Sequence, residues 1–179
     1  IRNQPEMITM QDDDVWIDGH VVKRTEARIS AMDRGFLFGD GFFETTRIVA
    51  GAPFRLRRHL ERLTAACQAT GWEWGPDAED LMDGVRRLIR RNGVGDGYLR
   101  ITVSRGVHQG GLTALRAQDP TVLIDAHPMD LAPIGDAPTV TLARAPWRRN
   151  ETSPITALKS LSYQESMLAL ARGRELGAD

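Results

Sequence analysis

The sequence predicts an α+β fold, in which strands and helices are mixed without strict strand–helix–strand alternation. Two observations support this class. Runs rich in β-branched or alternating residues stand at 15–23, 42–49, 97–104 and 121–127, and two windows of helical periodicity follow one another between 56 and 91. A chain of 179 residues, 41% hydrophobic and 26% charged, has room for one domain, or for one domain and part of another.

The first part of the chain is expected to be a loose lead-in followed by a hairpin. Residues 1–14 are polar, and 15–23 contain two short β-branched runs that turn at an Asp-Gly pair. The glycines between 35 and 41 predict a tight, irregular approach into the strand at 42–49. An Ala-Gly pair directly after that strand should turn it back on itself.

Two helices are predicted next, each from a stripe of apolar residues at helical spacing. The first stripe consists of Leu56, Leu60, Leu63 and Cys67, and the second of Leu81, Met82, Val85, Leu88 and Ile89. Strands at 97–104 and 121–127 follow, separated by a glycine-containing loop.

A Pro- and Gly-containing break at 131–138 is interpreted as a linker between two units. The predicted domains are therefore 1–130, an α+β unit, and 139–179, the opening of a second unit. The second unit is expected to begin with a strand at 139–145, where alternation resumes.

The last element predicted is a helix near the C-terminal end. Ser162 and Glu165 have the S-x-x-E spacing of a capping box, and Gly177 can end the helix in the left-handed conformation. An apolar stripe follows the cap, formed by Met167, Leu168, Leu170 and Ala171.

Composition excludes several classes of function. A formal net charge of -1 gives no general attraction to nucleic acid or to a membrane surface. The single cysteine, Cys67, excludes an internal disulfide framework, and no apolar run has the length of a membrane span or of a signal-peptide core. A cytoplasmic protein is expected. The chain begins without Met and stops at Gly-Ala-Asp, which is consistent with ends that are not the natural ones.

Lys159 is the first candidate for chemistry, because it stands just ahead of the C-terminal helix. A lysine held at such a place can lose its proton and act as an amine nucleophile. The alternative is an ordinary exposed lysine beside a helix, and this segment by itself favours the alternative.

The densest basic patch contains His59 and Arg62, which share a helix face beside the first apolar stripe. It is either an anion site, since a guanidinium binds phosphate bidentately, or a solvated positive face. No HExxH, Walker or CxxC pattern is present and the four histidines are dispersed, so no metal site is expected.

Together these pieces resemble the class IV (fold type IV) pyridoxal phosphate enzymes, which include branched-chain aminotransferases, D-amino-acid aminotransferases and aminodeoxychorismate lyases. The resemblance lies in DRGFLFGDGFFETTR (33–47), PFRLRRHLERL (53–63), YLRITVSRG (98–106) and the segment 153–179 around Lys159. It implies an N-terminal two-layer α/β domain and the start of a second, barrel-like domain.

The resemblance also implies residue roles and a cofactor, pyridoxal 5'-phosphate. Lys159 would be the lysine that forms the Schiff base with the cofactor and shuttles the α-proton of the substrate. Arg62 would bind the cofactor phosphate with His59 beside it, and Tyr163 would approach the ring hydroxyl. The residues expected to line the substrate side are Phe38, Phe43, Tyr98 and Arg100.

The implied activity is transfer of an amino group between an L-amino acid and a 2-oxo acid, in a homodimer. Two departures from the family pattern matter. Gly110 and Leu112 stand where the D-amino-acid enzymes carry an Arg and a His, which disfavours that specificity. The glutamate that pairs with the pyridine nitrogen would lie beyond Asp179, which indicates a truncated chain. The alternatives are an aminodeoxychorismate lyase, which eliminates pyruvate to leave 4-aminobenzoate, and an inactive fragment.

Overall fold

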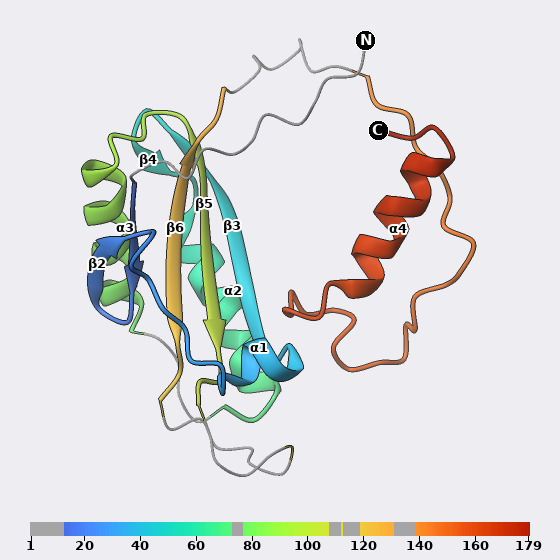
Figure 1. The fold of residues 1–179 in the computed structure, drawn as a ribbon, viewed down its shortest axis with the longest axis horizontal. Helices are drawn as coiled ribbons and strands as arrows, with labels where there is room; N and C mark the ends of the chain where they lie inside the picture. Colours follow the sequence, from blue (N-terminus) through green and yellow to red (C-terminus); the bar gives the residue numbers. More distant parts are fainter. Residues whose placement is uncertain (1–12, 73–76, 108–111, 113–118, 131–138) are drawn as a thin grey trace.

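The computed structural model describes residues 13–72, 77–107, 112, 119–130 and 139–179, and its centre is one antiparallel sheet (Figure 1). The strand order is β2-β1-β6-β5-β3-β4. The strands are β1 (Asp14–Ile17), β2 (His20–Lys23), β3 (Gly41–Val49), β4 (Ala52–Pro53), β5 (Gly97–Ser104) and β6 (Val122–Pro128). Neighbouring strands all run antiparallel, and the prediction of an α+β fold is confirmed.

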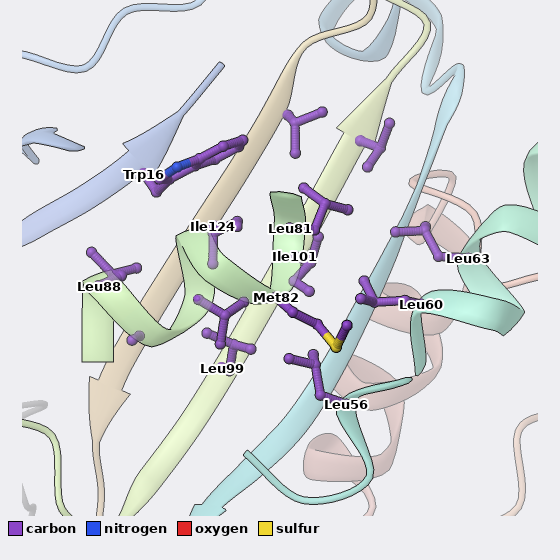
Figure 2. Packing of buried hydrophobic residues seen from close by; sticks show 14 of the residues in the cluster. Trp16, Leu56, Leu60, Leu63, Leu81, Met82, Leu88, Leu99, Ile101 and Ile124 are labelled. Carbon is purple, nitrogen blue, oxygen red and sulfur yellow. The ribbon is translucent and has the colours of Figure 1, made fainter. Parts of the chain in front are cut away.

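Two helices, α2 (Leu56–Ala69) and α3 (Ala78–Arg91), cover one face of this sheet. Both apolar stripes predicted from the sequence are buried, and they pack into one cluster with Leu99, Ile101 and Ile124 of the strands (Figure 2). Because side chains alternate along a strand, the residues between them point to the opposite face. This second face carries Phe43 and Arg100, which bear on function below.

The predicted hairpin and the turn after β3 both form. Asp18 and Gly19 have φ angles of 47° and 92°, so both central residues of the β1–β2 turn are left-handed, as the twist of a two-residue hairpin favours. Ala50 and Gly51 repeat the pattern between β3 and β4, with φ angles of 48° and 76°.

The glycine-rich approach to β3 contains a short helix that the sequence analysis did not predict, α1 (Arg34–Phe38). The carboxylate of Asp33 caps it by accepting hydrogen bonds from Gly35 N and Phe36 N, and Gly39 ends it with a φ of 67°. The same carboxylate accepts from the hydroxyls of Ser104 and Thr121, at 2.6 and 2.8 Å. One buried side chain thus ties α1 to the ends of two strand segments.

Residues 139–179 differ from the expectation at two places. The predicted strand at 139–145 does not form: Val140 and Leu142 are 63% and 87% exposed, and the backbone of Thr141 is bonded to Asp179. Alternation alone does not make a strand, because its N–H and C=O groups need a neighbouring strand. The proposed linker at 131–138 lies outside the described residues, so the domain boundary stays a prediction.

The C-terminal helix, α4 (Gln164–Glu175), forms, but without the predicted capping box. Its N-cap is Tyr163, no side chain caps it, and none of its residues is buried, so the apolar stripe is uncovered. Ser162 instead stands against α1, with its hydroxyl beside the Cα of Gly39. Gly177 has a φ of 81° just after the helix, which confirms the predicted left-handed end. Within the described ranges, no helix is long and apolar enough to cross a membrane.

Candidate active site around Lys159

The segment that carries Lys159 is attached to the edge of β3. Lys159 O accepts a hydrogen bond from Phe43 N at 3.0 Å, and Leu161 N donates to Gly41 O at 2.9 Å. β4 pairs only with the far end of β3, so the edge near Gly41 is open to this segment. A Cβ at position 41 would lie 2.6 Å from Leu161 Cδ1, so glycine permits the close approach. Lys159 is therefore positioned by β3, a strand that lies far from it in the sequence.

The half-buried Lys159 side chain lies among aromatic rings. Its Nζ is 4.2 Å from the ring centroid of Phe43 and 3.4 Å from the hydroxyl oxygen of Tyr163. The two rings meet edge to face at 4.9 Å. Within the described part of the chain Lys159 forms no ion pair, so its amine is held by a phenol and π faces rather than by a carboxylate.

Arg62 and His59, the predicted anion-binding pair, are both bonded to one buried carboxylate. Glu44 accepts from Arg62 Nε and Nη2, each at 2.6 Å, and from His59 Nδ1 at 2.8 Å. Burial raises the pKa of the Glu44 carboxyl, but the bonds from Arg62 and His59 more than offset this and hold that pKa below its usual value. Glu44 therefore stays ionised, and its hydrogen bonds with Arg62, together with its charge, raise the pKa of Arg62.

One pocket of about 430 Å³ connects the lysine with the arginine. Lys159, Tyr163 and Phe43 line it together with Arg62 and Glu44. Besides Arg62, α2 contributes Leu63 and three small side chains, Ala65, Ala66 and Ala69, which leave room beside the arginine. The pocket thus offers a primary amine and a guanidinium to the same small molecule.

Comparison with known proteins identifies the family of this chain. Residues 41–179 match the protein-family model described as Amino-transferase class IV. The chain belongs to this family. The resemblance drawn from the sequence motifs is therefore confirmed.

This class IV aminotransferase chain has relatives of more than one activity. It is 33% identical over 169 residues to a putative branched-chain-amino-acid aminotransferase of Methanocaldococcus jannaschii, covering 92% of this chain and 57% of that protein. It is 30% identical over 170 residues to an aminodeoxychorismate lyase of Bacillus subtilis, covering 92% and 55%. The chain spans little more than half the length of these relatives.

Among solved structures, the chain is similar to a branched-chain aminotransferase from Thermoproteus uzoniensis crystallised with norvaline. The TM-score is 0.75 at 28% identity, and the match covers 93% of this chain and 57% of that one. The fold is thus that of the N-terminal part of the class IV aminotransferases, as the sequence predicted.

Of the four residues expected on the substrate side, two lie together next to Lys159. The guanidinium of Arg100 stacks on the Phe43 ring at 3.7 Å, on the face opposite to the one that α2 and α3 cover. Its Nε donates to the Thr102 hydroxyl at 3.1 Å. Loss of hydration lowers the pKa of Arg100. The nearby Tyr163 and Asp125 act in the opposite direction but offset this only in part.

The other two substrate-side candidates lie apart from the Lys159 pocket. Tyr98 stacks on His127 of β6 at 4.8 Å, towards the opposite end of β5 from Thr102. Phe38, at the end of α1, is 43% exposed, and its ring centroid lies 5.2 Å from the guanidinium of Arg34.

Of the two positions that disfavour a D-amino-acid specificity, Gly110 lies outside the described residues. Leu112 is described and exposed. The roles of all these residues remain predictions.

Sequence reasoning missed Glu44, the residue that joins the two halves of the anion-binding pair. A signal was present: in the strand at 42–49, Glu44 alternates with Phe42, Thr46 and Ile48, all of which point inward. A carboxylate at an inward position needs partners, and the basic stripe of the next helix supplies them. No group of three or more His, Cys, Asp or Glu side chains in the described ranges is placed to hold a metal ion.

Proposed function

We propose that this chain is the lysine-bearing part of a pyridoxal 5'-phosphate-dependent aminotransferase that moves an amino group between an L-amino acid and a 2-oxo acid. The observation that carries the proposal is the shared pocket of Lys159 and Arg62. An amine can bind an aldehyde covalently, and a guanidinium is suited to a phosphate. Pyridoxal phosphate carries both groups on one aromatic ring.

The donor set suits the phosphate, the aldehyde and the ring hydroxyl of that cofactor. Arg62 would hold the phosphate, with His59 beside it, and Tyr163 would stand next to the ring hydroxyl. Phe43 and the alanines of α2 supply apolar walls for a planar ring. When bound, the cofactor supplies an electron-withdrawing ring that makes the α-hydrogen of the substrate acidic.

Lys159 has two tasks in this proposal. Its amine would first bind the cofactor aldehyde. Once a substrate amine had displaced it, the freed Nζ would take the α-proton of the substrate and deliver it to the carbon that had carried the aldehyde. The Tyr163 hydroxyl, 3.4 Å from Nζ, orients the amine for that transfer. The Phe43 ring, 4.2 Å away, keeps water from one side of it.

On the substrate side, Arg100 is the group best suited to bind a carboxylate. It is rigidly stacked on Phe43 and partly stripped of water, which strengthens an ion pair with a substrate. Tyr98 and Phe38 are proposed to flank the substrate side chain. The homodimer and the cytoplasmic location expected from the sequence stay predictions.

The position of the covalent adduct tests the proposal, since the chain contains two lysines, Lys23 and Lys159. After pyridoxal phosphate is added and the adduct reduced with borohydride, peptide mass mapping should place the cofactor on Lys159. Lys159→Ala should lose the adduct and the visible absorbance of the cofactor. Lys23→Ala is the matched control, because Lys23 lies on β2 beside Asp14, and should keep both. An adduct confined to Lys23, or none at all, contradicts the proposal.

Aminodeoxychorismate lyase is the second candidate, supported by 30% identity to the Bacillus subtilis lyase across 92% of this chain. It would use the same lysine and cofactor but eliminate pyruvate. Incubation with aminodeoxychorismate and no amino acceptor distinguishes the two: pyruvate release would replace the transaminase proposal by the lyase. Appearance of a new amino acid only when a 2-oxo acid is present supports the transaminase.

A further inference from the structure

Glu44 is a carboxylate in the interior of the protein, and one of its two partners, Arg62, lines the pocket with it. The Glu44 side chain is 2% exposed, whereas the side chain of Arg62 is 62% exposed. Within the described residues, Glu44 accepts three hydrogen bonds, and all come from side chains of α2, two from Arg62 and one from His59. The network therefore joins a buried acceptor to two more exposed donors, of which Arg62 lines the pocket.

The geometry of the pair determines which edge of Arg62 is available. A guanidinium has five N–H bonds, and Glu44 takes one on Nε and one on Nη2. The two N–H bonds of Nη1 and the second one of Nη2 remain, on the edge that faces away from Glu44. Because Arg62 lines the pocket with Lys159, this outer edge is the one offered to an anion.

The same carboxylate fixes the His59 ring. An ionised carboxylate only accepts hydrogen bonds, so His59 Nδ1 must carry the proton in the 2.8 Å contact with Glu44. This sets both the orientation and the tautomer of the ring, and leaves Nε2 on its other side. An exposed arginine without such an anchor would lose side-chain freedom when it bound an anion.

We infer that Glu44 is a positioning residue for the phosphate of the bound cofactor, acting through Arg62 and His59. The inference rests on the proposed function. It assigns to Glu44 the selection of a phosphorylated aldehyde over the unphosphorylated one, a property separate from reaction at Lys159. Glu44 itself touches neither the aldehyde nor the reacting atoms.

The test compares two probes, pyridoxal 5'-phosphate and pyridoxal, which differ only in the phosphate. The 179-residue chain is titrated with each, and the ratio of the two dissociation constants is measured by absorbance. We expect the wild-type chain to prefer the phosphorylated probe and Glu44→Gln to reduce that preference by about tenfold or more, since charge-assisted bonds to Arg62 are lost. The affinity for pyridoxal should stay within about twofold.

Glu61→Gln is the matched control, because it removes one carboxylate next to Arg62 on α2 from an exposed position. It should leave the preference unchanged. In a background that lacks both donors, Arg62→Ala with His59→Ala, adding Glu44→Gln should have no further effect on the ratio, as a residue that acts through these two side chains requires. Glu44→Asp, which keeps the charge, should retain part of the preference.

Each result decides between the possibilities. If Glu44 had a structural role alone, Glu44→Gln would weaken the binding of both probes in parallel and leave the ratio of their dissociation constants unchanged. That result would overturn the inference, while an adduct on Lys159 would still support the proposed function. A wild-type chain that binds both probes equally would also overturn it. Failure of both probes to react with Lys159 would refute the proposed function, and the inference with it.

Discussion

Residues 13–130 and residues 139–179 are built in different ways, although both carry apolar patterns. In the first region, most of the buried apolar residues form one core between the sheet and two helices. In the second, α4 buries nothing, and Leu142, Met167 and Leu168 remain 57–87% exposed. In Figure 1 this second region stands beside the β3 edge of the sheet rather than against a core of its own.

The candidate site lies where the two regions meet. The first region supplies Glu44, His59, Arg62 and Phe43, all on β3 or α2. The second supplies Lys159 and Tyr163, and it is held at the sheet through the hydrogen bonds of the segment 159–161 to Gly41 and Phe43. The residues of the proposed anion site are therefore held by a packed scaffold, whereas Lys159 is positioned by a short contact at the sheet edge.

The largest expected effect separates the two regions by stability. Ile101 is 1% exposed at the centre of the core in Figure 2, and Ile101→Ala should lower the free energy of unfolding by about 2–5 kcal/mol. Leu142→Ala removes an apolar side chain of the second region that is 87% exposed, and should change the free energy of unfolding by less than about 0.5 kcal/mol. Urea denaturation measures both. Equal losses would contradict the contrast in packing.

The two regions also differ in how well their structure could be predicted from the sequence. In the first region, the apolar stripe of α3 could be predicted because the residues at helical spacing are the ones that the helix buries. The alternation at 139–145 and the S-x-x-E spacing at Ser162 are equally clear. A strand, however, also needs a neighbouring strand, and a helix cap needs a side chain that is free to reach the helix end. Thr141 is bonded to Asp179, and Ser162 stands against Gly39.

The candidate site shows the same limit. Lys159 and Arg62 could be found from their motifs, because each motif is local. The Glu44 bonds and the stacking of Tyr98 on His127 join residues 15 to 29 positions apart, and depend on strand register and helix placement. The inward position of Glu44 could be predicted, but its choice of partners required the fold.

A second prediction compares two ion pairs of equal length, Glu44–Arg62 and Glu175–Arg172, both at 2.6 Å. Glu44 is buried, whereas Glu175 is 65% exposed. Glu44→Gln should cost about 1–3 kcal/mol of unfolding free energy at pH 7, towards the lower end because Arg62 is itself exposed. Glu175→Gln should cost less than about 0.5 kcal/mol, since exposed pairs contribute little.

The pH dependence of that difference has a defined sign. The pKa of Glu44 is lower in the folded protein than its ordinary value of 4.5, so the stabilisation is present above that value and is lost as pH falls through the lower, folded-state pKa. The gap between wild type and Glu44→Gln should therefore be constant near neutrality and shrink below about pH 4.5. A gap that grew on acidification would contradict the ionised, hydrogen-bonded carboxylate.

The smallest expected effect uses Cys67, the single cysteine, as a reporter placed in the first region only. Burial raises the pKa of its thiol to about 12, and alkylation requires the thiolate, so reaction with iodoacetamide at neutral pH should wait for the core to open. Leu168→Ala, on α4 at 57% exposure, should leave the labelling rate within about twofold of wild type. Ile101→Ala should raise the labelling rate by more than about tenfold, because a loss of 1.4 kcal/mol already populates the open form ten times more. Acceleration by Leu168→Ala to a similar extent would mean that α4 unfolds together with the core, and that the edge contact at β3 joins the two regions into one cooperative unit.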